Sequence, residues 1–264
     1  MFGVGVGIRV GGFTPISGGG GFDPDAQAFF DRVTTAGGTL TTTEKNATNQ
    51  LVLDMKSAGI WTAMKAVYPM VGASAAACAQ NLKSSSFTGT FSSGWTFAST
   101  GVTPNGVSAF LDSGLNASTN LSPTSLSFGG YTSSTANATG YHGALPPNYF
   151  MHSFKSYNFT EYWRTAGASI NVSGGTLGMV QCNQVGTDSR IYTNNTLGTN
   201  DVNPMFILPN MNMYIGGTNN GGSGTFFDNH LISYYYYADG INPTQALNHY
   251  TAVQAFQVSL SRSV

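Results

Sequence analysis

The sequence predicts a mainly β protein: a jelly-roll β-sandwich with a short N-terminal helical segment before it and a C-terminal helix after it. Between residues 79 and 240, short apolar runs are separated by turn residues every 8–12 positions, which is the spacing of sandwich strands. Gly, Ser, Thr and Asn dominate this stretch. Helix-start signals at Asp23 and Asn242 place helical segments on either side of the predicted sandwich.

Residues 1–21 are predicted to form a glycine-rich extended arm. Its apolar side chains fall at alternate positions and so share one face of a strand: Val4, Val6, Ile8 and Val10. Ordering a residue costs about 1–2 kcal/mol, and more at glycine, whereas burying an apolar side chain contributes only about 1.5–3 kcal/mol. We therefore expect another protein to hold this arm, by strand addition or in a tight groove. The alternative is a low-complexity tail that lies on its own domain.

Residues 22–78 are predicted to be helical. Asp23 is a good N-cap, and the following proline suits the first helical position. Thr41 and Glu44 have the spacing of a capping box at the start of a second helix. The apolar residues between positions 60 and 67 predict a short third helix, which the proline at position 69 ends.

Residues 79–240 are predicted to form the sandwich. Apolar runs that predict strands lie at residues 95–97, 125–128, 177–180, 190–192 and 232–237. Turn signals separate them, as at Asn105 followed by glycine and at residues 219–222. The last run contains four consecutive tyrosines at positions 234–237. On a strand two of these point inward and two outward, and we expect the outward pair to pack under the C-terminal helix or against a partner.

Residues 241–264 are predicted to form a helix that packs on the domain. Asn242 caps this helix and Pro243 begins it. Its apolar side is expected to contact the N-terminal helices or an edge of the sandwich.

The charge of the chain argues against several classes of protein. The net charge is −1, only 8% of residues are charged, and the 10 Lys and Arg residues are scattered, so a nucleic-acid partner is not expected. A surface with so little self-repulsion suits a protein held in a large assembly. No apolar run reaches the 18 residues of a membrane span, and residues 1–12 lack a signal peptide's pattern. Cys78 and Cys182 are expected to be free buried thiols, with a single disulfide as the alternative.

Four stretches of the sequence resemble a family of phage and prophage virion proteins. They are residues 53–69 (LDMKSAGIW, then MKAVYP), 94–106 (GWT, then TPNG), 214–221 (YIGG, then NNG) and 247–257 (LNHYTAVQAFQ). The resemblance covers residues 22–262 and implies a laminin-G or concanavalin-A-like sandwich. That fold occurs in glycan-binding modules, glucanases and purely structural domains. The resemblance therefore implies the fold and a place in a virion more than a biochemical activity. Residues 1–21 lie outside the resemblance.

No catalytic or metal site is predicted. The chain has two Glu residues, and neither Glu44 nor Glu161 has a second carboxylate two or four positions away on a predicted strand, as the related glucanases have. The four His residues show no metal-binding spacing. The densest polar cluster, residues 228–230 (DNH), offers oxygen ligands for calcium or forms a loop with an Asx-turn, and we favour the loop.

One aromatic group is a candidate for glycan contact. Tyr157, Tyr162, Trp163 and Arg164 lie close together in the sequence, beside residues 141–142 and 148–149 of a loop that contains proline. Sugars stack on aromatic rings and form hydrogen bonds to polar side chains. The alternative is that these side chains enter the core or pack on a neighbouring subunit.

We therefore expect a non-enzymatic virion structural protein: a capsid-associated, spike or tail-complex subunit of a phage particle, without cofactor or metal. Its expected partners are other virion proteins, contacted through the arm, and further copies of itself. One alternative is a glycan-binding adhesion module on the particle surface, which contacts a host glycan. Another is a bacterial surface lectin encoded outside any phage.

Overall fold

The computed structural model describes residues 21–134, 140–145, 150–152, 161–165, 168–172, 177–201 and 207–264. The predicted arm, with Val4, Val6, Ile8 and Val10, lies outside these residues. The described helices are α1 (Pro24–Thr35), α2 (Thr42–Ser57), α3 (Ala75–Cys78), α4 (Ala117–Asn120) and α5 (Pro243–Ser259). The described strands are β1 (Met64–Tyr68), β2 (Thr90–Phe91), β3 (Trp95–Ala98), β4 (Gly101–Pro104), β5 (Leu111–Asn116), β6 (Ser125–Thr132), β7 (His142–Leu145), β8 (Phe150–His152), β9 (Glu161–Thr165), β10 (Ala168–Val172), β11 (Gly178–Val185), β12 (Asp188–Thr193), β13 (Thr196–Asp201), β14 (Asn212–Ile215), β15 (Thr218–Asn220), β16 (Ser223–Thr225) and β17 (Ile232–Ala238).

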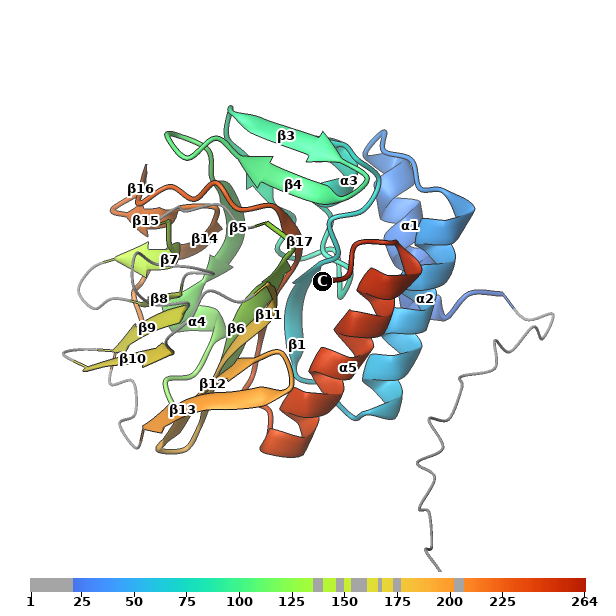
Figure 1. The fold of residues 1–264 in the computed structure, drawn as a ribbon. Helices are drawn as coiled ribbons and strands as arrows, with labels where there is room; N and C mark the ends of the chain where they lie inside the picture. The colour runs from blue at the N-terminus through green and yellow to red at the C-terminus, as the bar shows by residue number, and fades with distance from the viewer. Residues whose placement is uncertain are drawn as a thin grey trace, which may run out of the picture.

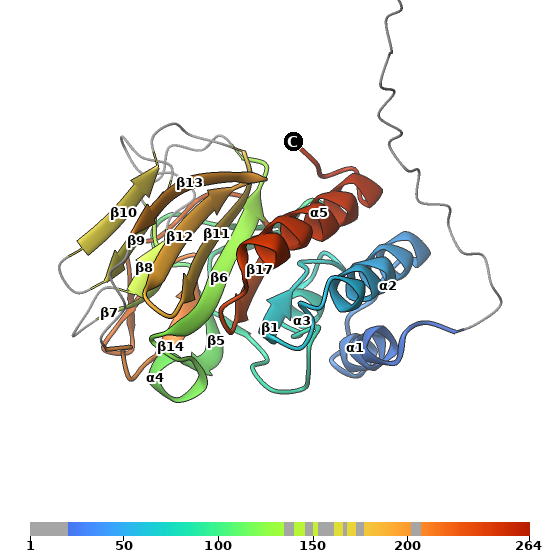
Figure 2. The ribbon, with the colours of Figure 1, turned by 90° about the horizontal axis from the view of Figure 1, so that it is seen from below.

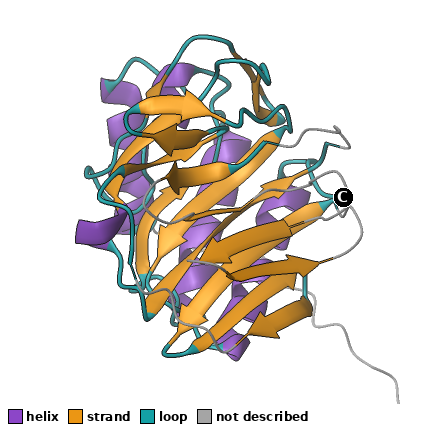
Figure 3. Cartoon of the chain, turned by 90° about the vertical axis from the view of Figure 1, so that its left-hand side faces the viewer, coloured by secondary structure: helices purple, strands orange, loops and turns teal. Residues whose placement is uncertain are grey.

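Two curled sheets face each other, as the sequence predicts (Figure 3). The larger sheet has the strand order β13-β12-β11-β6-β17-β4-β3, and β1 also pairs with β17. The smaller has the order β16-β15-β7-β14-β5-β2, and β8 pairs with β7. Strands β9 and β10 form a separate antiparallel hairpin. Leu111 and Ile215 of the smaller sheet pack against Phe128 and Cys182 of the larger one, and together they belong to the core between the sheets.

Helices α1, α2 and α5 form a third layer on the opposite face of the larger sheet (Figures 1 and 2). The core beneath them includes Phe29, Leu51, Val253 and Phe256, which are at most 2% exposed. The side-chain amide of Gln245 also donates to the carbonyl oxygen of Gly59, 2.9 Å away, and so joins the start of α5 to the end of α2. Of the two expected positions of the C-terminal helix, against the N-terminal helices or at an edge of the sandwich, the structure shows the first. Among the described residues, no helix is both long and apolar enough for a membrane span.

Strand β17 separates the two cores. Tyr234 and Tyr236 belong to the core under the helices, whereas Tyr235 and Tyr237 belong to the core between the sheets. All four tyrosines are fully buried. The alternation predicted for this strand is confirmed. Tyr234 and Tyr236, the pair that points away from the core between the sheets, lie under α5, as expected. Because both faces of β17 are covered, the strand is a continuous apolar and aromatic run instead of an alternating one.

The helix starts follow the local sequence signals. Asp23 caps α1 by accepting from the backbone N–H of Asp25. Thr41 and Glu44 form the predicted capping box of α2, and Asn242 forms one with Gln245 at α5. Two further predictions also hold: Cys78 and Cys182 are buried and form no disulfide, and the turn signal at residues 219–222 lies at the β15–β16 turn.

The predicted third helix is wrong. Residues 60–63 form a turn, and Met64–Tyr68 is strand β1, which pairs antiparallel with β17. Met64 faces the core under the helices, while Ala66 and Tyr68 face the core between the sheets. A short strand that is buried on both faces is apolar throughout. Hydrophobic periodicity therefore does not distinguish it from a buried helical turn.

Candidate functional site

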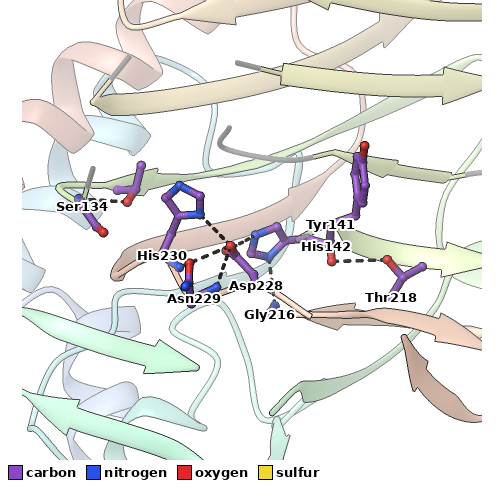
Figure 4. Close-up of polar contacts among 9 residues, drawn as sticks. Ser134, Tyr141, His142, Gly216, Thr218, Asp228, Asn229 and His230 are labelled. Atoms are coloured by element: carbon purple, nitrogen blue, oxygen red, sulfur yellow. Dashed lines mark hydrogen bonds and ion pairs between the residues drawn. The ribbon is translucent and has the colours of Figure 1, made fainter. Parts of the chain in front are cut away.

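The main buried polar centre of the described residues consists of His142, Asp228 and His230 (Figure 4). His142 is the first residue of β7, and the other two lie in the loop between β16 and β17. All three side chains are at most 1% exposed. The centre therefore joins the smaller sheet to the segment that leads into the central strand of the larger one.

Hydrogen bonds determine where the ring proton of His142 lies. The backbone N–H of Gly216 donates to Nδ1 of His142 over 2.9 Å. Nδ1 is therefore an acceptor, and the proton is on Nε2, which donates to Oδ2 of Asp228 over 3.0 Å. The imidazole also stacks on Tyr235, with ring centroids 5.3 Å apart. The ring is thus held on both of its nitrogen atoms and on one face.

The other oxygen of Asp228 accepts from its own loop. Oδ1 lies 2.6 Å from Nδ1 of His230 and 2.8 Å from the backbone N of Asn229. Burial of Asp228 pushes its pKa up, but hydrogen bonds from His142 and His230 outweigh this effect and hold the pKa below its ordinary value. Asp228 is therefore a buried carboxylate surrounded by donors.

Two glycines allow the backbone to approach this centre closely. Gly216 has φ +80°, and its carbonyl oxygen accepts from the backbone N–H of Asp228 over 2.9 Å. A Cβ atom on Gly140 would lie 2.2 Å from Cα of Asp228. A larger residue at Gly140 would push this segment away from the loop, whereas a side chain at Gly216 would strain the backbone and meet the ring of Trp95.

The arrangement holds the loop between β16 and β17 against the start of β7. Nε2 of His142 and Nδ1 of His230 both point at the carboxylate of Asp228, and all three side chains are at most 1% exposed. In the part of the chain that the structure describes, no group of three or more His, Cys, Asp or Glu is arranged to hold a metal ion. Of the two predictions for residues 228–230, the structure supports the Asx-type loop, because Oδ1 of Asp228 accepts from the next two backbone N–H groups.

The loop held by this centre carries an exposed aromatic residue. Phe226 is 52% exposed and has φ +50°, a left-handed conformation that a bulky residue rarely adopts. Its ring contacts Tyr141 edge to face at 5.8 Å, and its carbonyl oxygen accepts from the backbone N–H of Tyr141 over 2.9 Å. The next residue, Phe227, packs over Gly217 and Gly224. This surface, formed by Tyr141 and Phe226, is called the aromatic edge below.

The structure places only some of the predicted glycan-contact residues. Tyr162, Trp163 and Arg164 lie on β9, whose backbone alone is described, and Tyr157 lies outside the described residues. Strand β9 lies beside β8, the neighbour of β7, so these residues and the aromatic edge belong to adjacent parts of the fold.

The His142–Asp228 pair and the exposed ring of Phe226 are not predicted from the sequence. His142 was predicted to lie in a loop beside the aromatic group, but it begins a strand and is buried. Sequence spacing gives no signal for a pair whose members are 86 positions apart. The only local signal was residues 228–230 themselves.

Comparisons with known proteins bear on the fold. No protein-family model and no curated protein matches the chain. A solved structure that resembles it is domain 4 of AbnA, an extracellular GH43 arabinanase from Geobacillus stearothermophilus, in complex with arabinotriose. The TM-score is 0.50 and the identity 15%, over 71% of this chain and 98% of that domain. At this identity the likeness supports the β-sandwich architecture alone.

Proposed function

We propose that this chain is a non-enzymatic structural subunit of a phage particle, anchored by the arm of residues 1–21. The observation that carries the proposal is the attachment point of the arm. Several independent contacts hold that point on the helical layer, directly after a segment whose composition favours an external partner. The low charge of the chain, with a net charge of −1 and only 8% of residues charged, supports the same role.

The attachment point comprises Phe22, Asp23 and the residues that hold them. The ring of Phe22 packs edge to face on Phe30, with centroids 5.0 Å apart. The backbone N–H of Asp23 donates to Oδ1 of Asn49 over 2.7 Å, and its carboxylate lies 2.7 Å from Nζ of Lys56. The same ammonium group lies 2.6 Å from Asp25. A pull on the arm is therefore transmitted to α1 and α2 together.

Deletion of residues 1–20 tests this proposal. We expect the shortened chain to fold with an unchanged melting temperature and to be absent from purified particles. A matched control carries Val258→Ser, which changes an exposed apolar residue on α5 (57% exposed) and should leave incorporation unchanged. Incorporation of the shortened chain at the level of the full chain would refute the role of the arm.

The second candidate function is glycan binding on the particle surface. Two observations favour it: the similar domain of AbnA was solved with arabinotriose, and the aromatic edge exposes the ring of Phe226 in a part of the fold adjacent to β9, which bears Tyr162, Trp163 and Arg164. Binding of oligosaccharides on a glycan array, compared between the native chain and Trp163→Ala, tests this function. Absence of any bound glycan would count against it.

A further inference from the structure

We propose that the aromatic edge binds a neutral oligosaccharide, with the ring of Phe226 as the stacking surface. This inference rests on the second proposed function and assigns it a site that the sequence analysis did not contain.

The backbone of Phe226 has an unfavourable conformation. A phenylalanine at φ +50° is strained, and a glycine or asparagine would adopt this conformation more easily. The strain is not offset by burial, because the side chain remains 52% exposed. A strained backbone that presents a half-exposed ring is the arrangement expected where the ring itself is used.

The loop that carries Phe226 is held in place by several contacts. The carbonyl group of Phe226 is bound by the N–H of Tyr141, and two positions further on the loop is held by the side chain of Asp228. Phe227 fills the space over Gly217 and Gly224, so the loop is also supported from within the sheet. A ring that is held in place before binding loses little conformational entropy when a ligand stacks on it.

The residues around Phe226 indicate the chemistry of the ligand. The sequence between Asp201 and Asp228 contains no charged residue, and Asn, Thr and Gly predominate around Phe226. Asn229, three positions after Phe226, is exposed and offers an uncharged amide in the same loop. An anionic ligand would require a cation in these segments, whereas a neutral sugar requires an aromatic face and uncharged hydrogen-bonding groups.

A protein partner fits the aromatic edge less well. Stable protein interfaces bury roughly 800 Å² on each partner around an apolar centre. On the hairpin β15–β16 beside it, the exposed positions are Asn220, Gly221, Gly222 and Ser223, none of which has a large apolar side chain. The edge therefore suits a ligand of a few sugar rings.

The test uses the full chain and isothermal titration with arabinotriose, cellotriose, maltotriose and, as a charged comparison, trigalacturonate. We expect at least one neutral trisaccharide to bind. Phe226→Gly should weaken this binding at least tenfold while leaving the melting temperature equal or higher, because glycine relieves the strain at φ +50°. Phe226→Trp should retain binding. Val258→Ala, on the helical layer, is the matched control and should bind as the native chain does.

Three results would overturn the inference. Unchanged binding in Phe226→Gly would refute this site, and a loss in Trp163→Ala alone would then place glycan binding on β9. Binding of trigalacturonate alone would refute the assignment of a neutral ligand. Absence of binding by every trisaccharide would refute the site and the second candidate function together, and particle incorporation would remain a separate test of the first.

Discussion

The hydroxyl group of Tyr234 lies 2.9 Å from Nε2 of His249, and this buried contact joins the middle of β17 to α5. Nδ1 of the same ring lies 2.9 Å from Oε1 of Gln181, whose amide nitrogen donates to the carbonyl oxygen of Ala246. The amide orientation makes Oε1 the acceptor, so Nδ1 of His249 carries the proton and Nε2 accepts from Tyr234. The neutral ring accepts the hydroxyl proton of Tyr234, which would lose this acceptor if Nε2 were protonated.

Low pH is therefore expected to lower the free energy of unfolding through protonation of His249, which lies between β17 and α5. Burial lowers its pKa from 6.5 to about 3. As the pH falls, the unfolded chain therefore protonates His249 before the folded chain does. The stability contributed by the neutral ring is complete above pH 6.5 and is lost between pH 6.5 and about pH 3. The free energy of unfolding should fall by about 1.4 kcal/mol per pH unit in this window, or about 2 kcal/mol between pH 6.5 and 5. Urea denaturation at a series of pH values measures this slope.

The matched variant for this prediction is His249→Asn. Its amide nitrogen keeps a donor toward Gln181 but does not titrate. We expect lower stability than the native chain at pH 7 and a smaller dependence on pH between 6.5 and 5. A variant with the same slope as the native chain would show that other groups cause the acid sensitivity.

Helix starts and strand faces were predictable because their signals are local. The capping residues of α1, α2 and α5 lie within three positions of the N–H groups that they bind. The alternation in β17 follows from strand geometry. Strand β1 was not predictable in this way, because its identity depends on pairing with β17, about 170 positions later in the sequence.

The candidate site depends even more on distant contacts. His142, Gly216 and Asp228 meet only because β7, β14 and the loop before β17 converge in the folded sandwich. Likewise, the sequence does not reveal the left-handed conformation of Phe226, which the hydrogen bond from Tyr141 and the anchoring of Asp228 impose. The neutral composition around Phe226 was visible in the sequence, but its position beside an exposed ring was not.

Arg262 should be among the most sensitive residues for stability. Its guanidinium group is buried and donates to the carbonyl oxygens of Pro69, Met70 and Ser233 and to the side chain of Gln257. Removing it in Arg262→Ala would leave several buried acceptors without donors. Each such group costs about 1–3 kcal/mol, so we expect a loss of roughly 3 kcal/mol or more in the free energy of unfolding, measured by urea denaturation.

Arg190→Ala is the control for that variant. Arg190 pairs with Asp188 at 2.5 Å, but both side chains are more than a quarter exposed. Exposed ion pairs contribute about 0–1 kcal/mol, so this variant should remain near native stability. Equal losses in the two variants would contradict the role of the buried guanidinium group.

Asp228→Asn tests whether the buried carboxylate holds the aromatic-edge loop in place. The ring N–H groups of His142 and His230 and two backbone N–H groups point at the two oxygens of Asp228. Asparagine keeps the shape but replaces one acceptor by a donor, which must then face another donor where water cannot enter. We expect a loss of about 3 kcal/mol in the free energy of unfolding, because hydrogen bonds to a charged group contribute about 1.5–3 kcal/mol each.

Asp188→Asn, at a half-exposed position, makes the same change in charge and should cost less than about 1 kcal/mol. If Asp228→Asn unfolded at the same urea concentration as Asp188→Asn, the ionised carboxylate would contribute nothing beyond its shape, and the loop would have to be held by its other contacts, those of Tyr141, Gly216 and Phe227.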